Sequence, residues 1–259
     1  MKQILLTNDD GFDAAGLVAL QNMLKNNLSD VRVLTIAPNR QKSACSHSLS
    51  LHNPLHLFKI SDDFYRLEDG TPADCVYIGL AKFFSAMPDL IISGINYGCN
   101  VAEDISYSGT CAGAKEGALQ GIKSIAISQF YAGDSLDKYG YDLACKISIN
   151  LIKKILNNEL QIAKKEFLNL NIPAVSKQDY KGLKVTKMGQ KNYDVAIKEA
   201  IDPRGRGYIW IGEPCVKCES ANDLNTDIGA ILNDYASLSA IKFDATAYES
   251  LENLKKCLQ

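Results

Sequence analysis

The chain has 259 residues, of which 46% are hydrophobic and 22% charged, and its formal net charge is −2. This composition is typical of a globular protein with a large α/β core. The chain has no excess of basic residues that could neutralise a nucleic-acid backbone, so we expect no stable nucleic-acid complex. The apolar run at residues 4–7 is too short for a signal peptide or a membrane span, so we expect a cytoplasmic protein without membrane contact.

The first 130 residues alternate short apolar runs with helical patterns. Expected strands cover residues 2–7, 31–37, 89–93 and 124–128, and expected helices cover residues 14–27, 72–84 and 110–121. Residues 49–60 alternate in part and predict one or two extended pieces. This succession of strands and helices favours an α/β fold with a doubly wound, mostly parallel sheet.

The rhythm changes after a long amphipathic helix expected over residues 136–157. Turn residues then separate expected strands at 167–172, 183–188 and 208–211, followed by a helix at 223–234, a strand at 236–243 and a last helix from Thr246. We interpret residues 1–259 as a single domain, with a core of about 1–160 and a C-terminal β-hairpin and helix extension of about 161–259. The hairpin region near 180–215 is either an arm for contacts between subunits or an ordinary surface hairpin.

Two aspartates, Asp9 and Asp10, come directly after the first expected strand. In open α/β sheets, ligands bind outside the carboxyl ends of the strands. Two adjacent carboxylates would repel a pyrophosphate, but they suit a hard cation such as Mg²⁺, Mn²⁺ or Ca²⁺, which prefers oxygen ligands. The alternative is that one of them caps the following helix, which would need only one aspartate.

Three further loops are expected to carry polar residues at the same edge of the sheet. Residues 38–47 bring two cations, hydroxyls and an imidazole, which suit binding of an anion, coordination through a hydroxyl, or an ordinary solvated loop. Asn96 lies in a glycine-flanked turn, where it offers a neutral oxygen to a cation or tolerates left-handed backbone. Ser108 and Thr110 lie at the start of an expected helix, whose backbone N–H groups make an anion site that is compatible with a plain N-cap.

The histidines, the cysteines and the single tryptophan are expected to have structural rather than catalytic or ligand-binding roles. We expect no three-histidine metal site from His47, His52 and His56, which lie in a segment predicted to be extended. Cys215 and Cys218 form a C-x-x-C without a second pair, so we expect no zinc there, and we expect the eight cysteines of the chain to be reduced. Trp210 is expected in the core rather than as a platform for a stacked base.

Several motifs, taken in order, resemble the stationary-phase survival protein E (SurE) family of nucleotidases. They are ILLTNDDG at 4–11, APNRQKSACSHSLSL at 37–51, GTPADC at 70–75, SGINYGCN at 93–100, YSGTCAGAKEG at 107–117 and DPRGRGYIWIG at 202–212. Together they span the chain from residue 4 to about 240. The resemblance implies a Rossmann-like α/β domain whose C-terminal extension joins subunits, partly by exchange of elements, into a homodimer or homotetramer.

The resemblance also implies an activity and the residues that carry it. The family hydrolyses nucleoside 5′- and 3′-monophosphates with a divalent metal, and some members trim short polyphosphate or oligonucleotides. Its metal ligands map onto Asp9, Asp10, Ser43 and Asn96, and the two aspartates are then the catalytic pair. We expect one divalent cation per subunit, Mg²⁺ or Mn²⁺ with Ca²⁺ as a third candidate. The residues expected against the substrate phosphate are Asn100, Ser108, Gly109 and Thr110.

The chain departs from the family pattern at Phe12, Ala15 and Ala44. These positions supply no ligand, so the departures affect only the rim of the expected pocket and hence the preference among bases.

Two other classes of protein offer rival interpretations of the acidic pair. A receiver-type signalling module also binds Mg²⁺ after its first strand, but it needs a phospho-acceptor aspartate and a lysine where this chain has residues 93–96 and 128–130. A phosphatase of the haloacid-dehalogenase type needs D-x-D, whereas Asp9 and Asp10 are adjacent. No cysteine or serine is clearly paired with a histidine, so the sequence favours direct attack by water over a covalent intermediate.

Overall fold

The structure, a computed structural model, describes residues 1–131, 133, 135–211 and 216–258. Its main sheet contains the strands β1 Lys2–Thr7, β2 Val31–Pro38, β3 His56–Ser61, β4 Phe64–Glu68, β5 Leu90–Tyr97, β6 Ser124–Gln129, β7 Glu166–Ile172, β8 Leu183–Val185 and β13 Ala236–Lys242. They lie in the order β3-β4-β2-β1-β5-β6-β7-β13-β8. Neighbours run parallel except in the pairs β3–β4 and β7–β13, so the expected mostly parallel sheet is confirmed.

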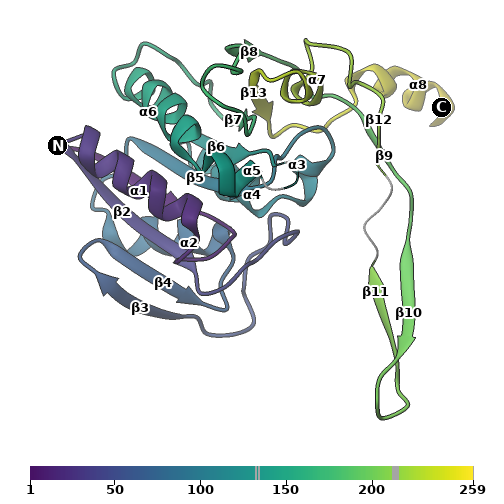
Figure 1. Cartoon of the computed structure of the whole chain (residues 1–259), viewed down its shortest axis with the longest axis horizontal. Coiled ribbons are helices and arrows are strands. Elements are labelled where there is room, and N and C mark those ends of the chain that lie inside the picture. The colour runs from purple at the N-terminus through teal and green to yellow at the C-terminus, as the bar shows by residue number, and fades with distance from the viewer. Residues whose placement is uncertain (132, 134, 212–215, 259) are drawn as a thin grey trace.

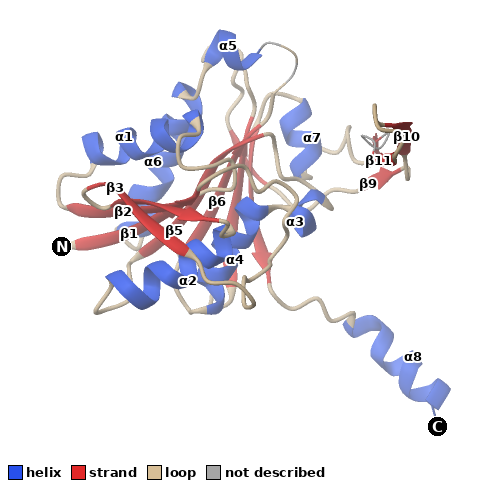
Figure 2. Cartoon of the chain, turned by 90° about the horizontal axis from the view of Figure 1, so that it is seen from below, coloured by secondary structure: helices blue, strands red, loops and turns tan. Residues whose placement is uncertain are grey.

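Helices cover both faces of this sheet (Figure 2). On one face α1 (Ala15–Asn27) packs with α6 (Asp142–Leu156), and on the other α2 (Pro72–Phe83) packs with α4 (Gly109–Leu119). Three shorter helices lie in the connections: α3 (Asp104–Tyr107), α5 (Ser135–Tyr139) and α7 (Asp227–Leu232). The expected doubly wound architecture is therefore confirmed.

The central strand β1 shows why these residues form a covered sheet. Ile4, Leu5 and Leu6 are all fully buried, as expected of a parallel strand with helices on both sides. Ile4 and Leu6 enter the core beneath α1 and α6, whereas Leu5 enters the core beneath α2. Burying one such side chain stabilises the fold by about 1.5–3 kcal/mol relative to leaving it in water.

Helix α4 lies very close to the sheet because glycines recur on one of its faces. A Cβ atom added to Gly109 would lie 2.8 Å from the Cβ of Asp9. One added to Gly113 would lie 2.8 Å from the hydroxyl oxygen of Ser93. These separations are shorter than carbon contacts allow, so only glycine lets the start of α4 approach the carboxyl end of β1.

Several element boundaries differ from the expectations. The single helix expected over residues 136–157 is two helices, α5 and α6, separated at Gly140, whose φ of 56° is left-handed. The helix expected over residues 223–234 begins only at Asp227, where the Thr226 hydroxyl caps its first turn. Strand β5 runs on to Tyr97, β4 was not expected, and the last helix starts at Tyr248.

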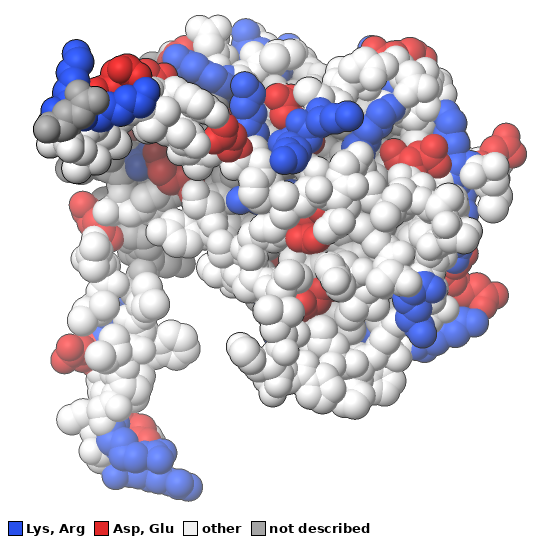
Figure 3. All heavy atoms as spheres, turned by 180° about the vertical axis from the view of Figure 1, so that it is seen from behind, with Lys and Arg blue, Asp and Glu red and all other residues white. Residues whose placement is uncertain are grey.

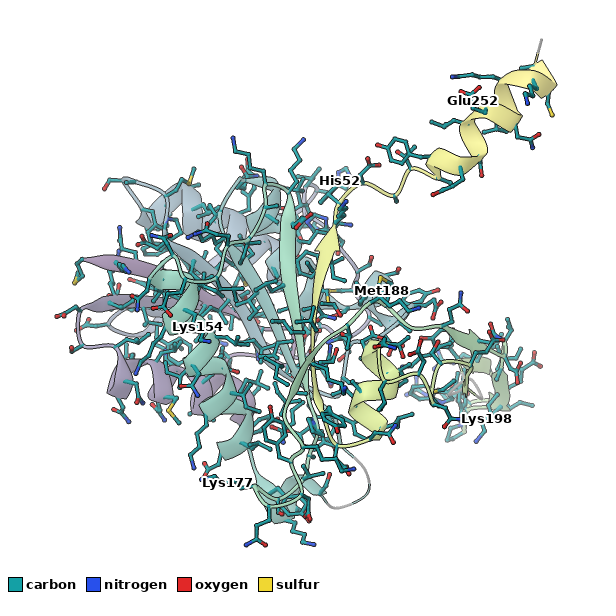
Figure 4. The ribbon with its side chains drawn as sticks, turned by 90° about the horizontal axis from the view of Figure 1, so that it is seen from above. His52, Lys154, Lys177, Met188, Lys198 and Glu252 are labelled. Atoms are coloured by element: carbon teal, nitrogen blue, oxygen red, sulfur yellow. The ribbon has the colours of Figure 1, made fainter. Side chains whose placement is uncertain are left out.

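The C-terminal part of the chain leaves the sheet in two places (Figure 1). Strands β10 (Ile197–Ile201) and β11 (Gly207–Ile211) form an antiparallel hairpin that projects far from the sheet, and β9 (Lys191–Tyr193) pairs with β12 (Val216–Cys218) nearer to it. Helix α8 (Tyr248–Leu258) also stands away from the sheet and has no buried residue. Figure 4 shows Lys198 on the hairpin and Glu252 on α8, both well outside the α/β core.

Trp210 does not belong to the core. It is 66% exposed on β11, so the expectation of a core tryptophan is wrong. The YIWI pattern is apolar enough for a core strand, but no other layer of the described chain covers the hairpin that contains it.

The surface carries charges of both signs. Lysine and arginine as well as aspartate and glutamate side chains lie in scattered groups on the face in Figure 3, and uncharged residues cover much of its centre. In the part of the chain that the structure describes, no helix is both long and apolar enough to span a membrane. The seven described cysteines are free thiols. Cys215 lies outside the described residues, so the interpretation of the C-x-x-C pair stays a prediction.

Candidate active site

The polar loops meet at a point where the sheet changes its direction of winding. Strand β1 lies between β2 and β5, and its last residue, Thr7, pairs with Ser93 of β5. The chain leaves β1 through α1 on one face, whereas it reaches β5 through α2 on the other. The crevice between the two strand ends is therefore a topological switch point, where α/β sheets bind ligands.

Asp9 is buried against the start of α4. Its side chain is only 3% exposed, and the Thr110 hydroxyl donates a hydrogen bond to its Oδ1. The backbone N–H of Lys42 donates to the Asp9 carbonyl at 2.7 Å, which holds the second polar loop beside the first. The acidic strand end, the loop after β2 and the helix start are thus in contact, as the sequence predicts.

Hydrogen bonds offset only part of the unfavourable free energy of removing the two carboxylates from water. Burial raises the pKa of Asp9 from 3.8 to about 6, the hydrogen bond from Thr110 opposes this increase, and the nearby charge of Asp10 adds to it. Burial also raises the pKa of Asp10, although the Tyr97 N–H donates to its Oδ2 at 2.8 Å. Neither aspartate takes part in an ion pair within the described residues. A bound cation would relieve this unfavourable charge, so the pair fits a metal site.

The rival helix-cap interpretation of the aspartates fails. Helix α1 has Ala14 at its N-cap, and no side chain forms a capping hydrogen bond there. Both carboxylates therefore remain available to a ligand.

Asn96 is oriented as a neutral oxygen donor. It follows a register irregularity in β5, between Ser93 and Asn96, and is 9% exposed. Its Nδ2 donates to the carbonyl of Gly98 at 2.8 Å, where the backbone turns with a φ of 105°. The amide nitrogen is thus engaged, while Oδ1 has no hydrogen-bond partner among the described residues, which suits coordination of a hard cation.

Ser43 lies on the loop beside the acidic pair, but its hydroxyl is exposed and accepts a hydrogen bond from Gln41 at 2.9 Å. No contact joins its side chain to Asp9, Asp10 or Asn96 in the described structure. Its neighbour Lys42 donates its backbone N–H to the Asp9 carbonyl, so the loop that carries Ser43 is attached to the acidic strand end.

The start of α4 supplies the environment of an anion site. Ser108 is the N-cap, and its hydroxyl accepts the N–H of Cys111 at 3.0 Å. Gly109 and Thr110 follow in the first turn and lie against Asp9. The N-terminal end of the helix dipole therefore faces the crevice next to the acidic pair, where it favours a negative group.

Asn100 belongs to a buried network of amides. Its backbone N–H donates to Asn171 and its side chain donates to Ser128, both at 2.8 Å. Its carbonyl accepts from the side chains of Asn169 and Asn171. Asn100 thus fixes the loop after β5 to β6 and β7. Sequence reasoning missed the two β7 asparagines, although polar residues at alternate positions in the otherwise apolar FLNLNI strand were a signal.

A second missed residue is Glu116 on α4. It is 3% exposed, and its carboxylate lies 2.8 Å from Nε2 of His47, whose hydrogen bond lowers the pKa of Glu116. His47 belongs to the same loop as Ser43, so the pair fastens that loop to α4. Ser46 adds two bonds to the turn before α4, from its N–H to the Tyr107 carbonyl and from its hydroxyl to the Ser106 carbonyl.

A cavity of about 640 Å³ lies between α4 and the strands β7 and β13. Ser46 and Ser108 line it, so it shares a wall with the acidic site. Lys115, Phe167 and Phe243 are also among its lining residues. It offers space beside the site, although neither Asp9 nor Asp10 lines it.

These features define a class of protein: an α/β protein with an acidic pair, one member buried and the other half-buried, at the switch point of its sheet and next to the N-terminus of a helix. The sequence matches the family described as Survival protein SurE over residues 4–195. The chain belongs to the SurE family, and the resemblance inferred from its motifs is confirmed.

Relatives support the same assignment over the whole chain. Proteins called 5′-nucleotidase SurE from Campylobacter hominis and Campylobacter fetus subsp. fetus are 50% and 49% identical to it. The first match covers 100% of both chains, and the second covers 98% of this chain and 99% of the relative. The crystal structure of the SurE protein from Aquifex aeolicus is similar, with a TM-score of 0.83 and 38% identity over 99% of this chain and 100% of that one.

Proposed function

We propose that this chain is a divalent-metal-dependent 5′-nucleotidase that hydrolyses nucleoside 5′- and 3′-monophosphates to nucleoside and phosphate, with short polyphosphate as a further substrate. One observation carries the proposal: two desolvated carboxylates lie together beside a helix N-terminus, with no cation of the described chain to balance them. Such a site suits a cation and a phosphate together. The name 5′-nucleotidase, borne by relatives about half identical in sequence, supports the choice of substrate.

Asp9, Asp10, Asn96 and Ser43 would hold one divalent cation per subunit, Mg²⁺ or Mn²⁺, with Ca²⁺ as a third candidate. When bound, the cation would withdraw charge from the phosphoryl oxygens and acidify a water molecule. The two aspartates give formal charge, and Asn96 gives the neutral oxygen that its bond to Gly98 leaves free. Ser43 would join after its loop turns the hydroxyl from Gln41 toward the pair.

The residues around the pair would position the phosphate. The first turn of α4, from Ser108 to Thr110, presents backbone N–H groups, and Thr110 keeps the Asp9 carboxylate in a fixed orientation. Asn100 supports this arrangement by anchoring the loop after β5. One carboxylate of the acidic pair accepts the proton of the attacking water. Most of the rate enhancement then comes from positioning and electrostatic stabilisation.

The rival classes are not favoured. The chain belongs to the SurE family and matches relatives called 5′-nucleotidase SurE, which favours neither a receiver-type module nor a haloacid-dehalogenase-type phosphatase.

The exposed C-terminal elements suggest an assembly. The hairpin exposes Ile197, Ile209 and Trp210, and α8 exposes Leu251 and Leu254. Apolar side chains collected on elements that stand away from the core are typical of contacts between subunits. We therefore propose a cytoplasmic homodimer or homotetramer joined through the extension of residues 161–259.

A phosphate-release screen tests the proposed function. The purified chain is assayed on several nucleoside monophosphates and on simple phosphoesters, with and without a chelator. The proposal expects chelator-sensitive release of phosphate with a preference for nucleotides. Equal turnover of all phosphoesters in the presence of excess chelator would refute it.

A further inference from the structure

The two aspartates of the candidate site contact different parts of the fold, and the proposed function gives no role to the side chain of Tyr97 next to Asp10. Asp9 faces the start of α4, where Thr110 donates to its carboxylate. Asp10 instead accepts the backbone N–H of Tyr97 at 2.8 Å. A phosphate held beside α4 therefore leaves the rest of its molecule free to extend past Asp10 toward Tyr97.

Tyr97 is the outermost ring of an aromatic stack. Its ring lies on that of Tyr131, with centroids 4.4 Å apart and planes inclined by 27°. Tyr131 meets Tyr141 edge-on, with centroids 6.0 Å apart and an angle of 90°. Tyr141 precedes α6 and packs against the main core, so the stack rests on the rigid part of the fold.

The outer ring of this stack remains open to solvent. Tyr97 is 55% exposed, although it directly follows the proposed ligand Asn96. Tyr131 supports one face of its ring, so the exposed surface includes aromatic carbon next to the acidic pair. Such a ring is held in place before any ligand arrives, and little side-chain entropy is lost when a second ring stacks on it.

We infer that Tyr97 is the platform on which the base of a nucleoside monophosphate stacks, an inference that rests on the function proposed above. All nucleobases have a π face, so a tyrosine platform binds them with little selection among bases. It distinguishes nucleotides from phosphoesters that lack an aromatic group. Tyr97 thereby determines the substrate class rather than the choice of base.

The cavity beside α4 is the competing place for the base, but of its two phenylalanines Phe167 is buried and Phe243 already packs against two side chains. The Lys115 ammonium lies 4.5 Å from the ring centroid of Phe243. The ring of His47 meets the same phenylalanine edge-on, with centroids 6.4 Å apart. A base would have to displace these groups before it could stack there, whereas Tyr97 needs no displacement.

The test compares adenosine 5′-monophosphate with ribose 5-phosphate, which has the same phosphoester and sugar but no base. For Tyr97→Leu we expect KM for the nucleotide to increase roughly tenfold with kcat nearly unchanged, because a stack present in both ground and transition states contributes uniform binding. Both constants for ribose 5-phosphate should stay at their parent values. Tyr97→Phe keeps the aromatic face and should behave like the parent on both substrates.

Two further variants complete the design. Tyr77→Leu removes a tyrosine that is also 55% exposed but lies on α2, and it should change neither substrate's constants. Tyr131→Leu withdraws the support beneath the platform and should cause the same selective loss as Tyr97→Leu. Melting temperatures verify that each variant is folded. If Tyr97→Leu does not fold, Tyr131→Leu provides the test instead.

Each result decides the matter. Equal losses on both substrates would overturn the inference, because Tyr97 would then act on the reaction through Asp10. Unchanged constants on both would also overturn it and place the base elsewhere, with the cavity beside α4 as the alternative. A parent inactive on both substrates would refute the proposed function and this inference together, so the two failures are distinguishable.

Discussion

The substitution Asp9→Asn is expected to stabilise the metal-free protein while destroying its metal site. The Asp9 carboxyl is 3% exposed, and its burial raises its pKa from 3.8 to about 6. Each pH unit between those values corresponds to about 1.4 kcal/mol. Above pH 6 the ionised carboxylate therefore costs the metal-free fold about 3 kcal/mol, and asparagine removes this cost.

The sign of the pH dependence follows from the raised pKa. The folded chain binds the proton more tightly than the unfolded chain, so the cost is fully present above pH 6, decreases as the pH falls toward 4, and is absent below 3.8. Asp9→Asn should consequently exceed the parent in stability by up to about 3 kcal/mol at pH 7 and by much less at pH 4. Saturating Mg²⁺ should reduce or reverse the difference at pH 7, because only the parent binds the ion well.

The assay is urea unfolding of chelator-treated protein at several pH values, with Asp13→Asn as the matched control. Asp13 is exposed, so its neutralisation should change stability by less than about 0.5 kcal/mol. A metal-free Asp9→Asn that is no more stable than the parent at pH 7, or a difference that does not shrink with decreasing pH, would refute the reasoning.

Three further outcomes are expected. Asn96→Ala removes a neutral oxygen whose place water can fill, so calorimetry should show only a modest loss of metal affinity. The kcat for a nucleoside monophosphate should nevertheless fall by a factor of about 10²–10³. An unchanged kcat would exclude Asn96 from the site. His47→Ala leaves the buried Glu116 carboxylate with only its hydrogen bond from Gln120 and should cost about 1–3 kcal/mol in urea unfolding. His47→Gln can still donate and should recover much of that loss, and equal losses in both variants would contradict the pairing. Light scattering at micromolar concentration should give at least twice the chain mass of 28.4 kDa, and a monomer would reject the proposed assembly.

Much of the sheet could be predicted because local patterns decided it. The strands β1, β2 and β6 are apolar on both faces, and their ends are marked by polar or turn residues, so their positions followed from the sequence. The acidic pair could be predicted for the same reason, since Asp9 and Asp10 interrupt the apolar run where β1 ends. Contacts at the carboxyl edge then followed from the rule that parallel strands end together.

Other features depend on contacts between distant residues. The pairing of His47 with Glu116 joins positions 69 residues apart, and nothing local marks either as a partner of the other. The amphipathic pattern over 136–157 continues through Gly140, so only the left-handed backbone at that residue reveals two helices. Trp210 has the neighbours of a core residue, and its exposure depends on how far the hairpin projects from the sheet.

The most direct test of the metal site is a calorimetric titration of Mg²⁺ or Mn²⁺ into the parent and into Asp10→Asn, together with kcat for a nucleoside monophosphate. Asp10→Asn keeps the shape of the side chain but removes one formal charge from the buried pair. We predict one cation per chain for the parent, and for the variant a strong loss of both affinity and turnover at an unchanged melting temperature. An Asp10→Asn protein that binds the cation and releases phosphate like the parent would contradict the account.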